Sequence, residues 1–210
     1  MSQEVFALIR EMNMKDVATQ MVLQCAPLIT GIKVSNLLII PKANMKKVRQ
    51  ILNGTHLSYV ILLEMDEKIT LMLFHREQLE AYLSKPCVQK LLVQLGYQSF
   101  GLEEMLPEFQ VRYANYMISN RNFPHEMGLL LGYPTEDVQG FIENEGKNFL
   151  YTGYWKVYAN LSEKIRVFQS YEDAKEELIH QVSHGMRIED MIHTYYKKQL
   201  QVAYEEVKDG

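Results

Sequence analysis

The sequence predicts an α/β fold of the α+β type, in which a small mixed sheet of about four strands is flanked by helices. Three observations support this prediction. Short apolar runs such as "NLLII" alternate with segments of helical periodicity, two runs flank a turn at Asp66 and Glu67 as in a β-hairpin, and the pattern after Asn160 is helical. We expect one α/β domain over 1–185. A C-terminal helix over 186–210 then packs on it or lies at a dimer interface.

The first half of the chain predicts a helix, a strand, a second helix and two further strands. Apolar residues recur at helical spacing in the first segment, and a short apolar run before a proline predicts the first strand. The expected elements are a helix over 3–24 closed by Pro27, a strand over 36–40, a helix over 43–52 stopped at Asn53-Gly54, and hairpin strands over 56–65 and 68–75.

The second half predicts helices, with one more strand among them. The helices over 124–131 and 135–145 form a corner, in which Gly132 supplies the turn and Thr135 caps the second helix. The other expected elements are helices over 76–83, 86–95 and 102–120, a strand over 150–158, a helix from Asn160 with a new segment at Ser170, and a final helix over 187–207 after Gly185.

Composition argues against several functional classes. The 210 residues carry a formal net charge of −4, which disfavours broad nucleic-acid binding. The apolar runs are too short to span a bilayer, and the N-terminus lacks the pattern of a signal peptide. Cys25 and Cys87 are isolated, so we expect neither a disulfide framework nor a Cys-based zinc site. These features predict a cytoplasmic protein that binds neither nucleic acid nor membrane.

The corner over 124–145 has the residue pattern of a helix-turn-helix unit, with Gly128 placed for close helix approach. Its second helix carries no Lys or Arg, whereas helices that read the major groove add basic residues. In a complex with DNA, this helix would instead present four carboxylates to the DNA phosphates, which would repel them. They belong to Glu136, Asp137, Glu143 and Glu145. We therefore expect a tight helical corner that does not bind DNA.

Residues capable of acid–base or ligand chemistry concentrate in 123–158. His125 follows Pro124 in the first turn of a helix and is a candidate proton carrier or metal ligand. Glu126 either assists it or stabilises the helix start. In the strand, alternation places Tyr154 and Lys156 on one face and Trp155 on the other. A lysine between tyrosines could bind an anionic or aromatic ligand, or simply cover ring edges.

The leading functional hypothesis is a pocket for a small anionic or planar ligand, built by the 123–158 block. Its expected ligand-binding residues are Tyr133, Tyr154, Trp155 and Lys156. No dinucleotide fingerprint, phosphate loop or nucleophile elbow occurs in the sequence, so no cofactor is indicated.

Two alternatives remain open. In the first, the protein is an enzyme with His125 as acid–base and Lys156 as stabiliser of developing negative charge; Glu126 is a further catalytic candidate. Both this enzyme and the binding pocket require His125 and Lys156 to share one pocket. In the second, the protein is an interaction module whose final helix pairs in a homodimer through Ile188, Met191, Ile192 and Tyr195.

A histidine ladder near the C-terminus is a weak metal-site candidate. Glu176, His180 and His184 recur every four residues and would share one helix face. Two such histidines need further ligands to hold a divalent metal, and only Glu189 and His193 are near in sequence. We predict no metal site there.

The block "FPHEMGLLLGYPTEDVQGFIENEGKNFLYTGYWKVY" (123–158) resembles the signature block of a bacterial family catalogued only as a domain of unknown function, family 3793 of that series. The resemblance extends more loosely upstream through "FHREQLEAYL" (74–83) and "LGYQ" (95–98), and it does not extend beyond Tyr158. It implies a small cytosolic protein that shares this block. It implies no established activity, cofactor or catalytic residue.

Overall fold

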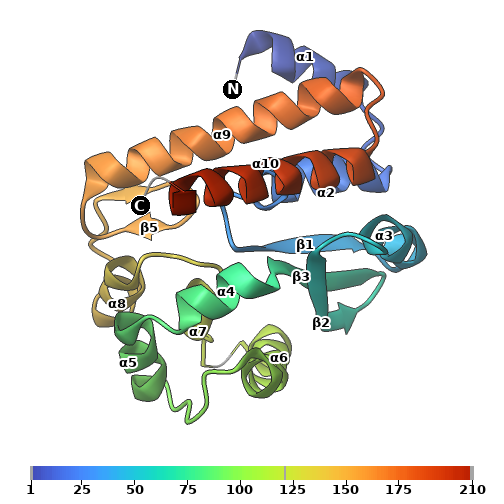
Figure 1. The fold of residues 1–210 in the computed structure, drawn as a ribbon. Helices are drawn as coiled ribbons and strands as arrows, with labels where there is room; N and C mark the ends of the chain where they lie inside the picture. The colour runs from blue at the N-terminus through green and yellow to red at the C-terminus, as the bar shows by residue number, and fades with distance from the viewer. Residues whose placement is uncertain (1, 121, 209–210) are drawn as a thin grey trace.

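The computed structural model describes residues 2–120 and 122–208. A three-stranded sheet lies between two groups of helices (Figure 1). The first group is α1 (Gln3–Glu11), α2 (Val17–Ile29), α9 (Leu161–Ser183) and α10 (Ile188–Lys208), and the second is α4 (Arg76–Leu83), α5 (Pro86–Gln94), α6 (Leu102–Ser119), α7 (Glu126–Leu130) and α8 (Thr135–Glu143). The predicted α+β class and the helical C-terminus are confirmed.

The sheet is antiparallel, in the order β1-β3-β2, and not mixed as predicted. Its strands are β1 (Ser35–Pro41), β2 (Leu57–Met65) and β3 (Lys68–His75), with the short η1 (Lys42–Asn44) and α3 (Met45–Leu52) between β1 and β2. The predicted hairpin turn is confirmed, with Asp66 in the left-handed region at φ 50°. The segment 150–158, expected as another strand, forms a separate hairpin.

The central strand β3 is buried on both faces and separates two cores. Leu71 and Leu73 pack with α2, α9 and α10, whereas Met72 and Phe74 pack with the second group of helices. Successive side chains of a strand point to opposite faces, which explains this division. The near-continuous apolar run of β3 is therefore the sequence signature of a strand covered twice.

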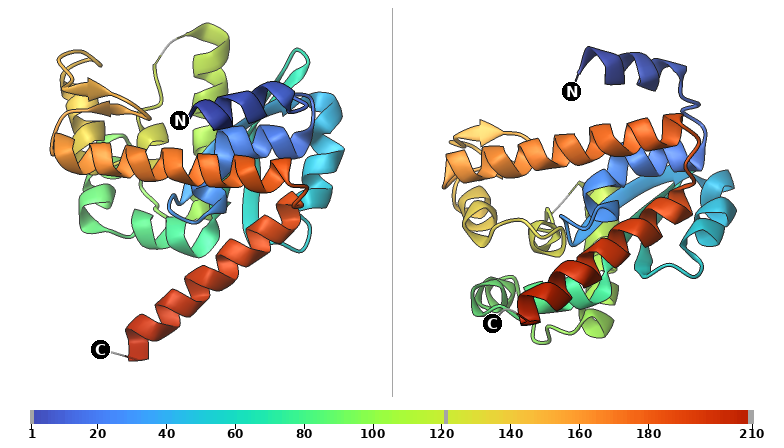
Figure 2. Two further views of the ribbon diagram at one scale, coloured as in Figure 1. Left: turned by 90° about the horizontal axis from the view of Figure 1, so that it is seen from above. Right: turned by 45° about the horizontal axis from the view of Figure 1, so that its top comes forward.

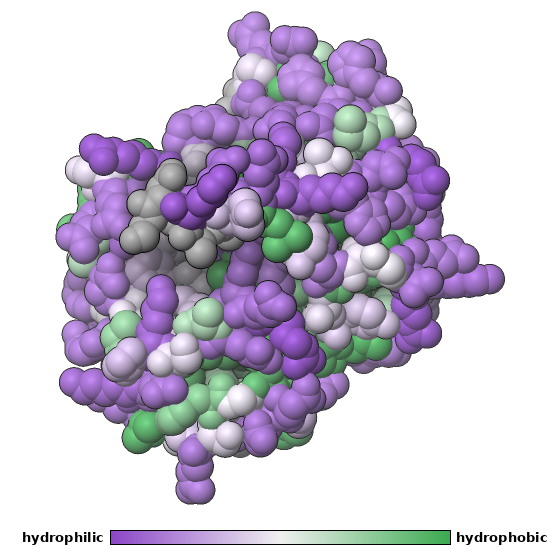
Figure 3. Space-filling model, viewed as in Figure 1, coloured by the Kyte–Doolittle hydropathy of each residue, from purple (hydrophilic) through white to green (hydrophobic). Residues whose placement is uncertain are grey.

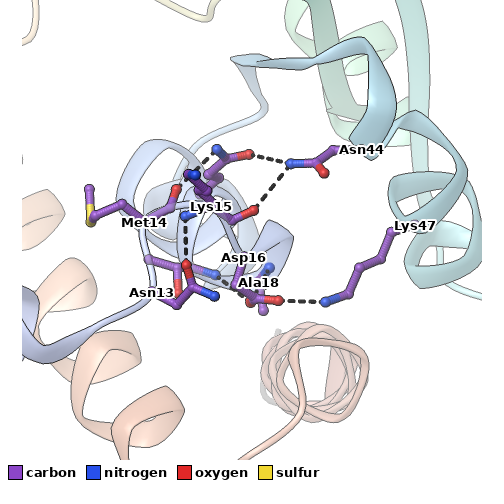
Figure 4. Close-up of polar contacts among 9 residues, drawn as sticks. Asn13, Met14, Lys15, Asp16, Ala18, Asn44 and Lys47 are labelled. Atoms are coloured by element: carbon purple, nitrogen blue, oxygen red, sulfur yellow. Dashed lines mark hydrogen bonds and ion pairs between the residues drawn. The ribbon is translucent and has the colours of Figure 1, made fainter.

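The predicted N-terminal helix over 3–24 is wrong, because the chain breaks between α1 and α2. The carboxylate of Asp16 caps α2 by accepting hydrogen bonds from the backbone N–H groups of Ala18 and Thr19, at 2.9 and 3.3 Å. Asp16 also forms an ion pair with Lys47 of α3 at 2.5 Å (Figure 4). Pro27, expected to close the first helix, lies inside α2.

The C-terminal region forms two long helices. The break expected at Ser170 is absent, since α9 runs unbroken from Leu161 to Ser183, and Gly185 then turns the chain at φ 82°. The helix face predicted to pair in a homodimer is already buried against this chain's own core, at Ile188, Met191, Ile192 and Tyr195. The later part of α10 extends beyond the rest of the fold (Figure 2), and the chain's last two residues lie outside the described part.

The surface is mostly hydrophilic on the face shown in Figure 3, with small apolar areas between hydrophilic ones. Among residues 2–120 and 122–208, no helix combines the length and apolar character that a membrane span needs.

Candidate functional site

A cavity of about 150 Å³ lies between α7, α8 and the hairpin of β4 (Tyr151–Thr152) and β5 (Lys156–Val157). Rings form much of its wall, and apolar side chains and three polar groups complete it. The rings are Phe123, Tyr133, Phe141 and Trp155; the other lining residues are His125, Met127, Gly128, Asp137, Val138 and Lys156. His125 and Lys156, which the binding and enzyme hypotheses required to share a pocket, both line this cavity.

The hairpin corrects the prediction of one strand over 150–158. Leu150 N–H donates to the carbonyl of Val157 at 2.8 Å, and Gly153 N–H donates to the carbonyl of Trp155 at 3.1 Å, so the chain reverses between β4 and β5. Strand alternation therefore fails through the turn. Trp155 is buried beneath the hairpin, whereas Tyr154 is partly exposed.

Trp155 and Tyr133 form one wall as a stacked pair, with ring centroids 4.9 Å apart and an interplanar angle of 27°. The rings of Trp155 and Phe168 of α9 are nearly perpendicular, at 79°, with their centroids 4.5 Å apart. The Tyr133 hydroxyl donates to the carbonyl of Tyr154 at 3.4 Å, and the backbone carbonyl of Tyr133 accepts from Tyr82 at 2.5 Å. Contacts from α4, α9 and the turn of the hairpin itself thus hold the wall in place.

The carboxylate of Asp137 fastens the hairpin to α8, and sequence reasoning missed this role. Asp137 is 2% exposed. Its Oδ2 accepts from the indole N–H of Trp155 at 2.7 Å, and its Oδ1 accepts from the backbone N–H groups of Tyr158 and Ala159 at 2.7 and 3.2 Å. Three donors satisfy a buried carboxylate well. The signal in the sequence that could have indicated this burial is the position of Asp137, directly before Val138 on the apolar side of an amphipathic helix.

His125 presents an imidazole without a hydrogen bond from any described residue. Its Nδ1 is fully shielded from solvent, and its ring meets Phe123 at 5.3 Å and Phe141 at 5.9 Å in edge contacts. Burial lowers the pKa of His125 below its usual range, while Glu126 opposes the shift in part. The neutral ring can therefore donate from one nitrogen and accept at the other.

Lys156 places its ammonium group among carbonyl and ring electrons. Nζ donates to the carbonyl of Gly146 at 2.6 Å, and it lies 4.8 Å from the ring centroid of Phe149 and 5.7 Å from that of Phe141. An ammonium group has three donors, so two remain after the bond to Gly146. Lys156 is the one cationic residue among the described residues that line the cavity.

Lys33 lies behind this wall and was not identified from the sequence. Its Nζ donates to the side chain of Asn36 at 2.7 Å and lies 5.4 Å from the ring centroid of Tyr133. Burial lowers the pKa of Lys33 to about 8, and the nearby Cys25 opposes this shift. Lys33 therefore adds partial positive character behind the aromatic wall, outside the cavity itself.

The corner between α7 and α8 is as tight as predicted. Gly132 adopts φ 72°, which glycine reaches without steric cost. A Cβ on Gly128 would lie 2.8 Å from Cγ2 of Val138, so only glycine permits this helix approach. Thr135, however, makes no capping hydrogen bond, because α8 begins after Pro134.

The acidic face expected on α8 is smaller than predicted. Asp137 is buried, and Glu136 accepts a hydrogen bond at 2.8 Å from Lys164, whose side chain is itself buried. Both carboxylates therefore accept hydrogen bonds from other residues of this chain. The sequence pattern alone could not distinguish them from acids that face solvent.

Two expected site residues lie elsewhere. Glu126 faces away from the cavity, with Oε1 accepting from the Tyr97 hydroxyl at 3.2 Å and from Arg112 at 3.5 Å. Tyr154 turns to α9, where its hydroxyl donates to Glu172 at 2.7 Å. Neighbouring helix residues point about 100° apart, which explains how Glu126 and His125 serve different sides of α7.

The histidine ladder lies on the outer surface of the C-terminal region. His184 Nδ1 lies 2.7 Å from the carbonyl of His180, an ordinary contact at a helix end. Within the described residues, no three His, Cys, Asp or Glu side chains gather as they would around a metal ion.

Comparison with known proteins finds one family. The family model described as "Protein of unknown function (DUF3793)" matches residues 21–192. The match begins well before and ends well after the block 123–158, and it includes the histidine ladder, which the resemblance alone did not reach. No curated protein and no solved structure matches the chain significantly.

Proposed function

The chain belongs to the DUF3793 family of proteins of unknown function, and from its cavity we propose that it binds a small planar ligand with an anionic or electron-rich edge. The observation that carries this proposal is the shared cavity. A Tyr133–Trp155 wall, an unpartnered His125 and a partly bonded Lys156 all line it. Aromatic walls with a few convergent polar groups are typical of small-molecule sites.

The volume of the cavity limits the ligand to about one ring. An apolar cavity of about 150 Å³ in another protein accommodates benzene, whereas drug-sized ligands occupy about 300 Å³ or more. A planar ring can lie against Trp155 in an offset stack. Its electron-rich edge would face Lys156, because an ammonium group donates hydrogen bonds and accepts none.

Trp155 provides a direct test, because it is the single tryptophan of the chain. Titration with benzoate should change its fluorescence saturably, and cyclohexanecarboxylate, which has the same charge but no planar ring, should bind much more weakly. Lys156→Met should weaken benzoate binding about tenfold, the scale of one charged hydrogen bond. Benzyl alcohol, which is uncharged, should bind the variant and the parent protein alike.

A matched pair of substitutions locates the site. Met127→Phe adds a ring inside the cavity and should abolish benzoate binding. Met65→Phe makes the same change at an exposed position of β2 and should leave binding unchanged. Equal behaviour of the two variants, or no response to benzoate in the parent protein, would refute the proposal.

Catalysis at the same site is a second candidate, favoured by His125, which lines the cavity and whose Nδ1 has no hydrogen-bond partner among the described residues. Its expected orienting carboxylate is missing, since Glu126 bonds to Tyr97 and Arg112 instead. Simple binding returns a ligand unchanged. If the protein converts a bound ligand into a product, and this activity disappears in His125→Gln, the result would favour an enzyme.

We also propose that the protein is cytoplasmic, and the free thiols of Cys25 and Cys87 support this location.

A further inference from the structure

A groove of about 550 Å³ lies between α3 and the start of β2, at one end of the sheet (Figure 1). This α3–β2 groove shares no lining residue with the cavity of the candidate site. Its floor is apolar and includes Met45, Leu52 and Leu57, which are 5–7% exposed and belong to the core formed with α2, α9 and α10. The core packing therefore holds the floor in place.

The rim of the groove carries positive charge that its surroundings do not neutralise. Lys46, Arg49 and Gln50 line it and are exposed, and their spacing of three and four residues places them on one face of α3. Among the described residues, no carboxylate forms an ion pair with Lys46 or Arg49. The neighbouring Lys47, in contrast, pairs with Asp16 (Figure 4).

This positive rim reflects an uneven distribution of charge along the sequence. Residues 17–63 contain five Lys and Arg residues and no Asp or Glu. Since the whole chain has a formal net charge of −4, the remaining residues carry −9. Four of the five cations, Lys42, Lys46, Lys47 and Arg49, lie on η1 and α3. The helix beside the groove is thus a basic element of an acidic protein, and it attracts a partner of opposite charge.

The groove needs a partner that is apolar as well as acidic. An ion pair between exposed side chains contributes little to binding, so most of the affinity must come from the apolar floor. A nucleic acid has no apolar side chain to offer the floor, and its phosphates call for more cations than the two on the rim. A membrane is bound by apolar side chains that project from a helix, whereas those of the floor are recessed.

We propose that the α3–β2 groove binds a segment of a partner protein in which an aromatic or large aliphatic residue is flanked by Asp or Glu. The apolar side chain would lie on the floor, as the anchor residues of a helix or strand do in other peptide-binding grooves. The flanking carboxylates would meet Lys46 and Arg49. The two proposed sites are separate, so this interaction does not depend on small-molecule binding at the first cavity.

Selection of random dodecapeptides displayed on phage against the whole protein tests the proposal without assuming a partner. The enriched peptides should carry an aromatic or large aliphatic residue with Asp or Glu beside it. A fluorescein-labelled copy of the most enriched peptide then serves as the probe in fluorescence polarisation. Its affinity should fall as the NaCl concentration rises from about 50 to 500 mM, because salt screens exposed charges.

Charge reversal tests the rim of the groove. Lys46→Glu/Arg49→Glu should weaken binding of the probe at least about tenfold, because two attractions become two repulsions. Lys90→Glu/Arg166→Glu makes the same change in net charge at exposed positions of α5 and α9, and it should leave binding nearly unchanged. Far-ultraviolet circular dichroism checks that both variants are folded like the parent protein.

Filling the groove tests its floor. Gln50→Trp places a large ring in the groove and keeps both cations, so it should abolish binding of the probe. Gln94→Trp makes the same change at the exposed last residue of α5 and should have no effect.

Several results would overturn the proposal. The selection could enrich no peptide, or only peptides without acidic residues. The probe could bind Lys46→Glu/Arg49→Glu or Gln50→Trp as tightly as it binds the parent protein. Poly(U) RNA, or vesicles of phosphatidylserine, could bind the parent protein more tightly than the probe does and lose this binding on charge reversal. The groove would then belong to a nucleic acid or to a membrane surface.

Discussion

Asp137 links the candidate site to the stability of the fold at the scale of a single residue. One carboxylate accepts hydrogen bonds from the indole of Trp155 and from the backbone at the start of the segment leading to α9. The orientation of the aromatic wall therefore depends on a group that need not touch the ligand. Asp137 is a positioning residue.

Asp137→Asn should destabilise the protein by about 2 kcal/mol. An amide can accept at its oxygen alone, so its NH2 group must meet either the Trp155 indole N–H or the backbone N–H groups of Tyr158 and Ala159, all of them donors. Chemical denaturation followed by far-ultraviolet circular dichroism measures the change. Asp173→Asn, the same substitution at an exposed position of α9, should have little effect. Equal losses in the two variants would contradict this role for Asp137.

At the scale of elements, the α7–α8 corner determines the width of the cavity. Gly128 and Val138 both line the cavity and touch across the corner. The helix-turn-helix pattern in the sequence therefore reflects the close packing of α7 against α8. Close approach of two short helices brings Tyr133, Asp137 and Phe141 to one side, where the hairpin covers them.

Gly128→Ala should cost about 1–3 kcal/mol of stability, because its Cβ would lie 2.8 Å from Val138. Shortening the neighbour should relieve the clash. We therefore expect the double variant Gly128→Ala/Val138→Ala to be more stable than the sum of the single effects predicts, a coupling that a double-mutant cycle measures. Additive effects would show that the corner adjusts by backbone movement instead.

At the scale of the whole molecule, α10 closes the first core across the end of the sheet. Its residue Tyr196 stacks on His56 at 3.7 Å, and His56 stacks on His75 of β3 at 5.0 Å. Neither ring nitrogen of His56 has a hydrogen-bond partner among the described residues. Burial, with smaller effects from His75 and His193, lowers the pKa of His56 to about 4.

This stack makes stability depend on pH. The unfolded chain protonates His56 near its ordinary pKa of 6.5, while the folded protein keeps it neutral down to about 4. Protons then bind preferentially to the unfolded state, so stability should fall as pH decreases from 6.5 towards 4. His56→Phe keeps the stack without titration. Between pH 7.5 and pH 5, the free energy of unfolding of this variant relative to that of the parent protein should rise by about 1 kcal/mol. This is less than the full pKa shift implies, because the ring is partly exposed.

Chemical denaturation at the two pH values checks this expectation. His184→Phe, at an exposed position beyond α9, is the matched control and should show the parent pH dependence. A difference between His56→Phe and the parent protein that does not change with pH would show that His56 contributes through packing alone.

Local pattern was enough to predict much of this protein. The period of apolar residues predicted α4, α5, α6 and the β2–β3 hairpin, because those periods arise from backbone geometry within each segment. Proximity in the chain also brought His125, Tyr133, Trp155 and Lys156 together as candidates. They lie in one compact run, and a tight corner keeps such a run close in space.

The direction of each side chain came from contacts distant in sequence. Glu126 faces Arg112 and Tyr97, Tyr154 faces Glu172, and Asp137 accepts from Trp155, and none of these partners is adjacent in the chain. The period of apolar residues predicts which residues are buried. The orientation of a buried carboxylate depends on the hydrogen-bond donors around it, and those come from other parts of the fold. A second cavity, lined by residues of α6 and α7, also depends on the tertiary structure. It exists only because these two helices meet across the second core.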